Sequence, residues 1–190
     1  MKGLSGAVLV GGRSSRFGSN KAEFIWQGKT LLEWALSSYQ DLDDVLMIGG
    51  TSHPLARVIK DKKPFAGALY GLATALEYAT SPRVAVMACD MPNLSAAYWL
   101  FLGQFEADIV IPKNKDGQLE PLAAIYSKNC LGSVQAALSR DQLRLTGWWQ
   151  NTSVISVRIV EWVELEPYFS SQLFLNANYQ EDLEFGARNG

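Results

Sequence analysis

The stretch "LVGGRSSRFGSNKAEF", residues 9–24, leaves a short apolar run and reaches a lysine before the chain becomes apolar again. Glycines let the backbone amides of such a loop turn inward, and a row of inward amides binds anions. The groups that could contact a polyphosphate are three glycines, two arginines, three serines and a lysine: Gly11, Gly12, Gly18, Arg13, Arg16, Ser14, Ser15, Ser19 and Lys21. The loop therefore favours a polyphosphate ligand. The alternative is an ordinary Gly/Ser turn with solvated arginines.

Two common phosphate-binding motifs do not account for this loop. Five residues separate Gly12 from Gly18, and Lys21 lies three positions further on, so the pattern G-x-x-x-x-G-K-[ST] is absent. The dinucleotide pattern G-x-G-x-x-G is absent as well. A phosphate site here has to be of another kind.

Outward from the loop, strand-like and helix-like segments alternate. Apolar residues run almost without interruption through residues 7–10, 45–48, 84–88 and 108–111. Such runs are typical of strands buried on both faces, as in a parallel sheet. Apolar residues recur at helical spacing in residues 31–39, 69–76 and 94–105. The pattern predicts an α/β fold with three layers: a mostly parallel central sheet, right-handed crossovers and helices on both faces.

The second half of the chain is less regular. Residues 120–127, "EPLAAIYS", suggest a strand that a proline opens, which places it near a sheet edge or a bend. We expect a helix over residues 128–139, a strand over residues 154–163 and a helix from about Glu181. There is no low-complexity linker and no repeat, so we expect a single domain over residues 1–190.

The composition excludes several classes of partner. The chain has 190 residues, of which 48% are hydrophobic and 19% charged, and its formal net charge is −2. It therefore offers no bulk electrostatic attraction for nucleic acid or an anionic membrane. The apolar run at residues 7–10 is too short for a signal peptide core or a membrane span. We expect a cytoplasmic protein whose two cysteines, Cys89 and Cys130, are buried thiols.

A single acidic residue follows the third apolar run, in "VAVMACDMPNLS", residues 84–95. The carboxyl ends of parallel strands meet at one edge of the sheet, so Asp90 and the glycine-rich loop should face the same crevice. A triphosphate there needs a cation, and Mg²⁺ takes only one or two protein oxygens, one of which Asp90 could supply. The alternative is that Asp90 is only a turn or cap residue.

These segments resemble a known family. Residues 9–36, "LVGGRSSRFGSNKAEFIWQGKTLLEWAL", are similar to L-x-G-G-x-[SG]-x-R-[MF]-G-x-x-K followed by G-K-x-L-L, the signature of nucleotidyltransferases with a sugar-transferase-like fold. Within that group the chain is most similar to the MobA-like molybdenum cofactor guanylyltransferases, over nearly its whole length. Residues 89–92, "CDMP", match the family motif C-D-M-P, whose aspartate is the metal ligand.

Two further segments extend the resemblance. Residues 174–184, "FLNANYQEDLE", resemble F-x-N-x-N-x-x-E-D-L, which implies that Asn176 or Asn178 completes the metal and phosphate site; we favour Asn178, and the alternative is an Asx turn before a helix. Residues 60–76 resemble the segment around G-P-L-x-G-[IL], with Ala68 in place of the proline. There the resemblance implies that Asp61 reads the guanine edge. The alternative is that Asp61 pairs with neighbouring lysines at the surface.

The resemblance implies a reaction as well as a site. A terminal phosphate of molybdopterin or the molybdenum cofactor attacks the α-phosphorus of GTP, and pyrophosphate leaves. A phosphate oxyanion is already deprotonated at pH 7, so no general base is required, and catalysis consists of positioning and charge stabilisation. The resemblance implies Mg²⁺ as cofactor and a handover of the acceptor from molybdenum-inserting proteins. Two alternatives stay open: a transferase that uses CTP or another nucleotide on molybdopterin or a sugar or polyol phosphate, and a non-catalytic nucleotide-binding protein.

The residues that the resemblance assigns fall into three sets. The catalytic set is Arg16, Lys21 and Asp90. The nucleotide-binding set is Leu9, Gly11, Gly12, Lys21, Asp61, Gly67 and Asp90. The metal-binding set is Asp90 and Asn178.

Overall fold

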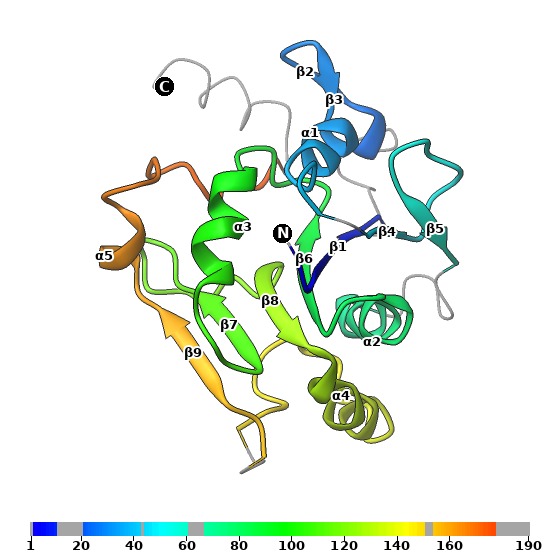
Figure 1. Cartoon of the computed structure of the whole chain (residues 1–190), viewed down its shortest axis with the longest axis vertical. Coiled ribbons are helices and arrows are strands. Elements are labelled where there is room, and N and C mark those ends of the chain that lie inside the picture. Colours follow the sequence, from blue (N-terminus) through cyan, green and yellow to red (C-terminus); the bar gives the residue numbers. More distant parts are fainter. Residues whose placement is uncertain (1, 11–20, 43, 61–66, 151–153, 178–190) are drawn as a thin grey trace.

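The computed structural model of the chain describes residues 2–10, 21–42, 44–60, 67–150 and 154–177. In these ranges seven strands form one sheet in the order β5-β4-β1-β6-β8-β7-β9 (Figure 1). The strands are β1 (Leu4–Leu9), β4 (Val45–Ile48), β5 (Arg57–Ile59), β6 (Arg83–Ala88), β7 (Ile109–Pro112), β8 (Ala123–Ser127) and β9 (Val157–Val160). Only β8 runs antiparallel to its neighbours, β6 and β7, among these strands. The expected mostly parallel sheet is confirmed.

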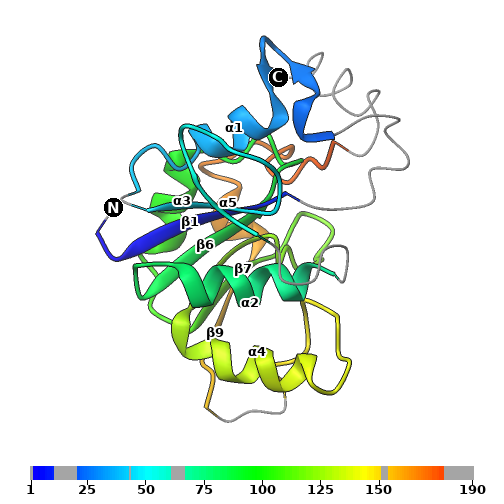
Figure 2. The same ribbon diagram turned by 90° about the vertical axis from the view of Figure 1, so that its right-hand side faces the viewer.

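Helices cover both faces of this sheet, as expected (Figures 1 and 2). The α-helices are α1 (Leu31–Ser37), α2 (Ala68–Tyr78), α3 (Ala96–Gly103), α4 (Leu131–Leu138) and α5 (Trp162–Leu165). Successive residues of a strand point to opposite faces, so Leu9 packs in one core with α2 and α4, and Val8 packs in the other with α1, α3 and α5. All six residues of β1 are buried, which explains why the apolar run at residues 7–10 is continuous where it overlaps this strand.

Side chains next to the helices fix where two of them begin. Thr30 and Glu33 form a capping box at the start of α1, where each side chain binds the other residue's backbone amide. The Ser95 side chain accepts a hydrogen bond from the Tyr98 backbone amide and caps α3. In the described part of the chain, none of the helices is long and apolar enough to cross a membrane.

Some expectations about individual elements were wrong. Of the two positions expected for the strand that a proline opens, the sheet edge is wrong, because β8 lies inside the sheet. Pro121 lies in the turn before β8, which agrees with the alternative of a bend and leaves the ladder hydrogen bonds of the strand intact. The strand expected over residues 154–163 is only β9, and the chain turns into α5 at Glu161, which caps that helix together with Glu164. The sheet also gains β5, and a small hairpin of β2 (Ile25–Trp26) and β3 (Lys29–Thr30) precedes α1. The helix expected from Glu181 lies outside the described residues.

Candidate functional site

The carboxyl edge of the sheet brings Lys21 and Asp90 together. Lys21 begins the short 3-10 helix η1 (Lys21–Glu23), and Asp90 lies in the turn that follows β6, two residues past its end. Their side chains form an ion pair with 2.5 Å between Lys21 Nζ and Asp90 Oδ2, and they are only 14% and 19% exposed. The end of the glycine-rich segment and the acidic residue thus share one site, although 69 positions separate them in the sequence.

The second carboxylate oxygen of Asp90 fits a cation. Asp90 Oδ1 is buried and has no hydrogen-bond partner among the described residues. A buried oxygen without a partner is rare in native proteins and points to a ligand such as an ion. The described ranges hold no cluster of three or more His, Cys, Asp or Glu residues that could bind a metal alone. A cation at Asp90 would therefore share few protein ligands, as Mg²⁺ does when a polyphosphate supplies the rest.

The segment that ends at Ala177 lies directly against Asp90. The Ala177 backbone amide donates a hydrogen bond to the Asp90 carbonyl oxygen at 2.9 Å. The Asn93 side chain holds the same segment by donating to the Gln172 carbonyl oxygen at 2.8 Å. The side-chain amide of Asn176 donates to the Phe174 carbonyl oxygen. The sequence pattern gave no reason to single out Asn93, because an asparagine after a proline resembles any turn residue.

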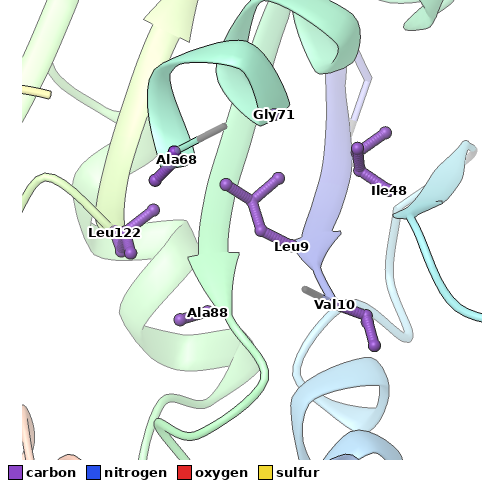
Figure 3. Close-up of a pocket in the computed structure, with 8 residues that line it drawn as sticks. Leu9, Val10, Ile48, Ala68, Gly71, Ala88 and Leu122 are labelled. Atoms are coloured by element: carbon purple, nitrogen blue, oxygen red, sulfur yellow. The ribbon is translucent and has the colours of Figure 1, made fainter. Parts of the chain in front are cut away.

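A small apolar pocket opens beside this edge (Figure 3). Its volume is about 80 Å³, and it lies between the ends of β1, β4 and β6 and the start of α2. The residues that line it are Leu9, Val10, Ile48, Gly67, Ala68, Gly71, Ala88 and Leu122. Two residues expected to bind nucleotide, Leu9 and Gly67, therefore contribute to one pocket.

Two glycines shape the wall that α2 contributes. Gly67 has a φ of +114°, a backbone conformation that other residues rarely adopt, and it precedes the first turn of α2 without a side-chain cap. Gly71 lets the helix approach β1, since a Cβ at this position would lie 3.0 Å from Leu9 Cδ1. The first turn of α2 therefore borders the pocket, and its Tyr70 amide donates a hydrogen bond to the Gly67 carbonyl oxygen.

Cys89 precedes Asp90 in the sequence, and its side chain is only partly exposed. It lies against the core that contains α1 and α3. Burial, together with the neighbouring Asp90 charge, raises the pKa of its thiol to about 12. The thiol is therefore protonated near neutral pH. Of the two thiols expected to be buried, Cys130 is buried and Cys89 is partly exposed.

Five of the expected site residues lie outside the described residues: Gly11, Gly12, Arg16, Asp61 and Asn178. The structure thus describes Leu9, Lys21, Gly67 and Asp90 from the expected set. It places Lys21 and Asp90 in contact and places Leu9 and Gly67 around the pocket.

Comparisons with known proteins agree with this architecture. The family described as MobA-like NTP transferase domain matches residues 6–151. A relative from Chloroflexus aggregans, named a probable molybdenum cofactor guanylyltransferase, is 32% identical over 199 residues, which cover 95% of this chain and 92% of the relative. The molybdenum cofactor guanylyltransferase of Desulfosudis oleivorans is 30% identical, over 97% of this chain and 94% of its own.

Solved structures show the same fold. Molybdopterin-guanine dinucleotide biosynthesis protein A from Archaeoglobus fulgidus superposes with a TM-score of 0.81, at 25% identity over 97% of each chain. The 2-C-methyl-D-erythritol 4-phosphate cytidylyltransferase of Thermus thermophilus shares the fold at a TM-score of 0.68 and 19% identity, over 96% of each chain. On the family match and the two sequence relatives, the chain belongs to the MobA-like NTP transferase family.

Proposed function

We propose that this protein is a molybdenum cofactor guanylyltransferase, which transfers GMP from GTP to the terminal phosphate of molybdopterin or the molybdenum cofactor. The single observation that carries the proposal is the contact between Lys21 and Asp90 at the carboxyl edge of the sheet. Membership of the MobA-like NTP transferase family and the names of the relatives from Chloroflexus aggregans and Desulfosudis oleivorans support it.

The reaction needs charge stabilisation more than proton transfer. An oxygen of the acceptor phosphate forms a bond to the α-phosphorus of GTP, while the bond from that phosphorus to the bridging oxygen breaks and pyrophosphate leaves. Lys21 is placed to neutralise the triphosphate and the departing pyrophosphate. Arg16 and the amides of Gly11 and Gly12 belong to the same proposed phosphate site.

A bound triphosphate would compete with Asp90 for Lys21. Its ammonium is paired with Asp90 Oδ2 at 2.5 Å, and the oxygens of a triphosphate compete for the same three N–H donors. Asp90 Oδ1, which has no partner among the described residues, would hold Mg²⁺, with Asn178 as a second ligand. The cation supplies positive charge that lowers the repulsion between the α-phosphate and an anionic acceptor.

The apolar pocket supports the rest of the nucleotide. Leu9 and Gly67 offer apolar contact and close backbone approach, as nucleotide sites commonly do. Asp61 reads the base in this proposal, because a carboxylate accepts hydrogen bonds from guanine N1–H and the 2-amino group, and adenine lacks both. The proposal also includes a single domain over residues 1–190, a cytoplasmic setting and a handover of the acceptor from molybdenum-inserting proteins.

Two measurements on the purified protein test this function together. Thermal stabilisation by GTP, CTP, UTP and ATP with Mg²⁺ ranks the nucleotides, and pyrophosphate release from each, with and without molybdopterin, reports turnover. We expect GTP to stabilise the protein most and pyrophosphate to appear only when GTP and molybdopterin are both present. A clear preference for CTP would overturn guanine recognition by Asp61. Tight GTP binding without pyrophosphate release across a panel of acceptors would favour a non-catalytic nucleotide-binding protein.

A further inference from the structure

Glu120 lies at the same edge of the sheet as Asp90, on the connection between β7 and β8. The antiparallel pairing of β6 and β8 sets Met87 opposite Ala123. Asp90 follows Met87 by three residues and Glu120 precedes Ala123 by three, so both extend past the same end of two neighbouring strands. The Glu120 backbone is fixed there, because its amide donates to the Pro112 carbonyl oxygen and its carbonyl accepts from the Ala123 amide.

A rigid turn holds one oxygen of the Glu120 carboxylate. The Asn114 side-chain oxygen accepts hydrogen bonds from the backbone amides of Asp116 and Gln118, which fixes the Asn114 side chain. Its amide nitrogen then donates to Glu120 Oε1 at 2.8 Å. Both the oxygen and the nitrogen of the Asn114 side chain are thus engaged, and this side chain holds one oxygen of the Glu120 carboxylate.

The other oxygen of this carboxylate has no partner in the described part of the chain. Hydrogen bonds from the described residues reach Glu120 Oε1 only, and no described lysine or arginine forms an ion pair with Glu120. The residue is half-buried, and burial raises its pKa although the Asn114 hydrogen bond opposes the shift. A half-buried carboxylate with an unused oxygen is suited to accept hydrogen bonds from a bound molecule.

The place of Glu120 in the strand order and its negative charge together indicate what kind of substrate group its free oxygen would contact. Across the sheet β1 is followed by β6, β8 and β7 (Figure 1). Asp90 follows β6 and Glu120 lies on the connection between β7 and β8, so Glu120 lies farther from β1 in the strand order than Asp90 does. Leu122, two residues further along the chain, still lines the apolar pocket (Figure 3). A carboxylate repels phosphate groups, so at this position it suits the uncharged, N–H-bearing part of the acceptor and not a phosphate.

We propose that Glu120 recognises the acceptor by accepting hydrogen bonds from adjacent N–H groups of its pterin ring. This inference rests on the proposed function, which makes the acceptor a pterin. A pterin presents the ring N3–H and the 2-amino group side by side, and a carboxylate with two oxygens complements this pair. The corresponding lumazine carries an oxygen in place of the 2-amino group and would meet the carboxylate with a repulsive acceptor.

The test uses Glu120→Gln in the full chain, with a matched control. The carboxamide keeps an oxygen for the Asn114 hydrogen bond, so a purely structural role tolerates the change. Asp116→Asn makes the same chemical change at an exposed position of the same turn. Fluorescence titrations measure the binding of 6-hydroxymethylpterin phosphate and its lumazine counterpart, and a separate titration measures GTP.

We expect the wild-type protein and Asp116→Asn to prefer the pterin over the lumazine by about tenfold or more, as sites built around a substrate N–H do. Glu120→Gln should lose that preference through weaker pterin binding and keep its affinity for GTP. Unchanged pterin preference in Glu120→Gln overturns the proposal, and weaker GTP binding in that variant assigns Glu120 to the nucleotide ribose. A wild-type protein that binds GTP without preferring the pterin overturns the inference alone. Failure to bind GTP contradicts the proposed function itself.

Discussion

Gly67 lines the pocket and has a backbone conformation that residues other than glycine rarely adopt. Its φ of +114° lies in a region that is open mainly to glycine, although a Cβ there would find its nearest neighbour among the described residues, the Leu143 carbonyl oxygen, only at 4.0 Å. We predict that Gly67→Ala lowers the free energy of unfolding by about 1–3 kcal/mol, because the backbone and not the space resists the methyl group. Urea unfolding of the purified variant measures this change.

Gly132 provides the matched control for this substitution. It lies within α4 on the surface, and its φ is not positive. Apart from the backbone of its own helix and its chain neighbours, no atom of the described residues lies within 4 Å of a Cβ at this position. Gly132→Ala should therefore stabilise the protein by up to about 1 kcal/mol, the difference in helix propensity. A Gly67→Ala variant as stable as wild type would show that the positive φ at Gly67 carries no strain.

Single residues of the site differ in how far the sequence predicts them. Asp90 stands out because it closely follows an apolar run, and Lys21 because it ends the glycine-rich loop, yet their 2.5 Å contact depends on the adjacency of β1 and β6. Glu120 follows no chemical motif. Its position beside Asp90 comes only from the antiparallel register of β6 and β8, which no local pattern specifies.

At the scale of elements, Asp44 ties several segments together at the amino edge of the sheet. It immediately precedes β4, and its carboxylate accepts hydrogen bonds from the Thr80 amide and hydroxyl, from the Ser5 hydroxyl and from Arg57 of β5. Burial alone would raise the pKa of Asp44, but the hydrogen bonds from Thr80 and Arg57 outweigh it and lower that pKa. The folded state therefore favours the ionised carboxylate.

This balance predicts a pH-dependent effect of Asp44→Asn. At pH 7 the variant should lose about 2 kcal/mol of unfolding free energy, since hydrogen bonds to a charged group are replaced by weaker ones. The unfolded chain binds the proton more readily than the folded one, so this contribution is complete above the ordinary Asp pKa of 3.8 and disappears as the pH falls through the lower folded value. Urea unfolding of both proteins from pH 7 down to about pH 3 measures the difference. A difference that grows as the pH falls would contradict this account.

Elements were predictable where burial is complete on both faces. The continuous apolar runs marked β1, β4, β6 and β7, and helical spacing marked α1, α2 and α3. β5 escaped notice because it has three residues and begins with Arg57. The boundary between β9 and α5 was missed because Trp162 and Val163 continue an apolar pattern, while the Glu161–Glu164 capping interaction starts a helix. In a segment this short, the pattern of apolar residues does not distinguish a strand from a helix.

At the scale of the whole molecule, the two edges of the sheet carry different groups of residues. The amino edge carries the Asp44 hydrogen bonds, which join β1, β4, β5 and the segment after α2. The carboxyl edge carries Lys21, Asp90 and Glu120, together with the apolar pocket at the start of α2. The Asp44 hydrogen bonds and the candidate site therefore lie at opposite edges of the sheet.

The central claim is that Lys21 and Asp90 act as a unit on one bound triphosphate. The measurement that tests it most directly is the single-turnover rate of pyrophosphate release from GTP in the presence of molybdopterin. It compares the wild type with Lys21→Ala, Asp90→Asn and the double variant, each with a wild-type circular dichroism spectrum. Arg158→Ala and Glu164→Gln, which break a surface ion pair on β9 and α5, serve as controls.

We predict that each single variant at the site slows release by about a hundredfold or more. The double variant should be about as slow as the slower single one, because residues that act as a unit are not additive. The two control variants should turn over at nearly the wild-type rate. A properly folded Lys21→Ala or Asp90→Asn protein that releases pyrophosphate at the wild-type rate would contradict the claim.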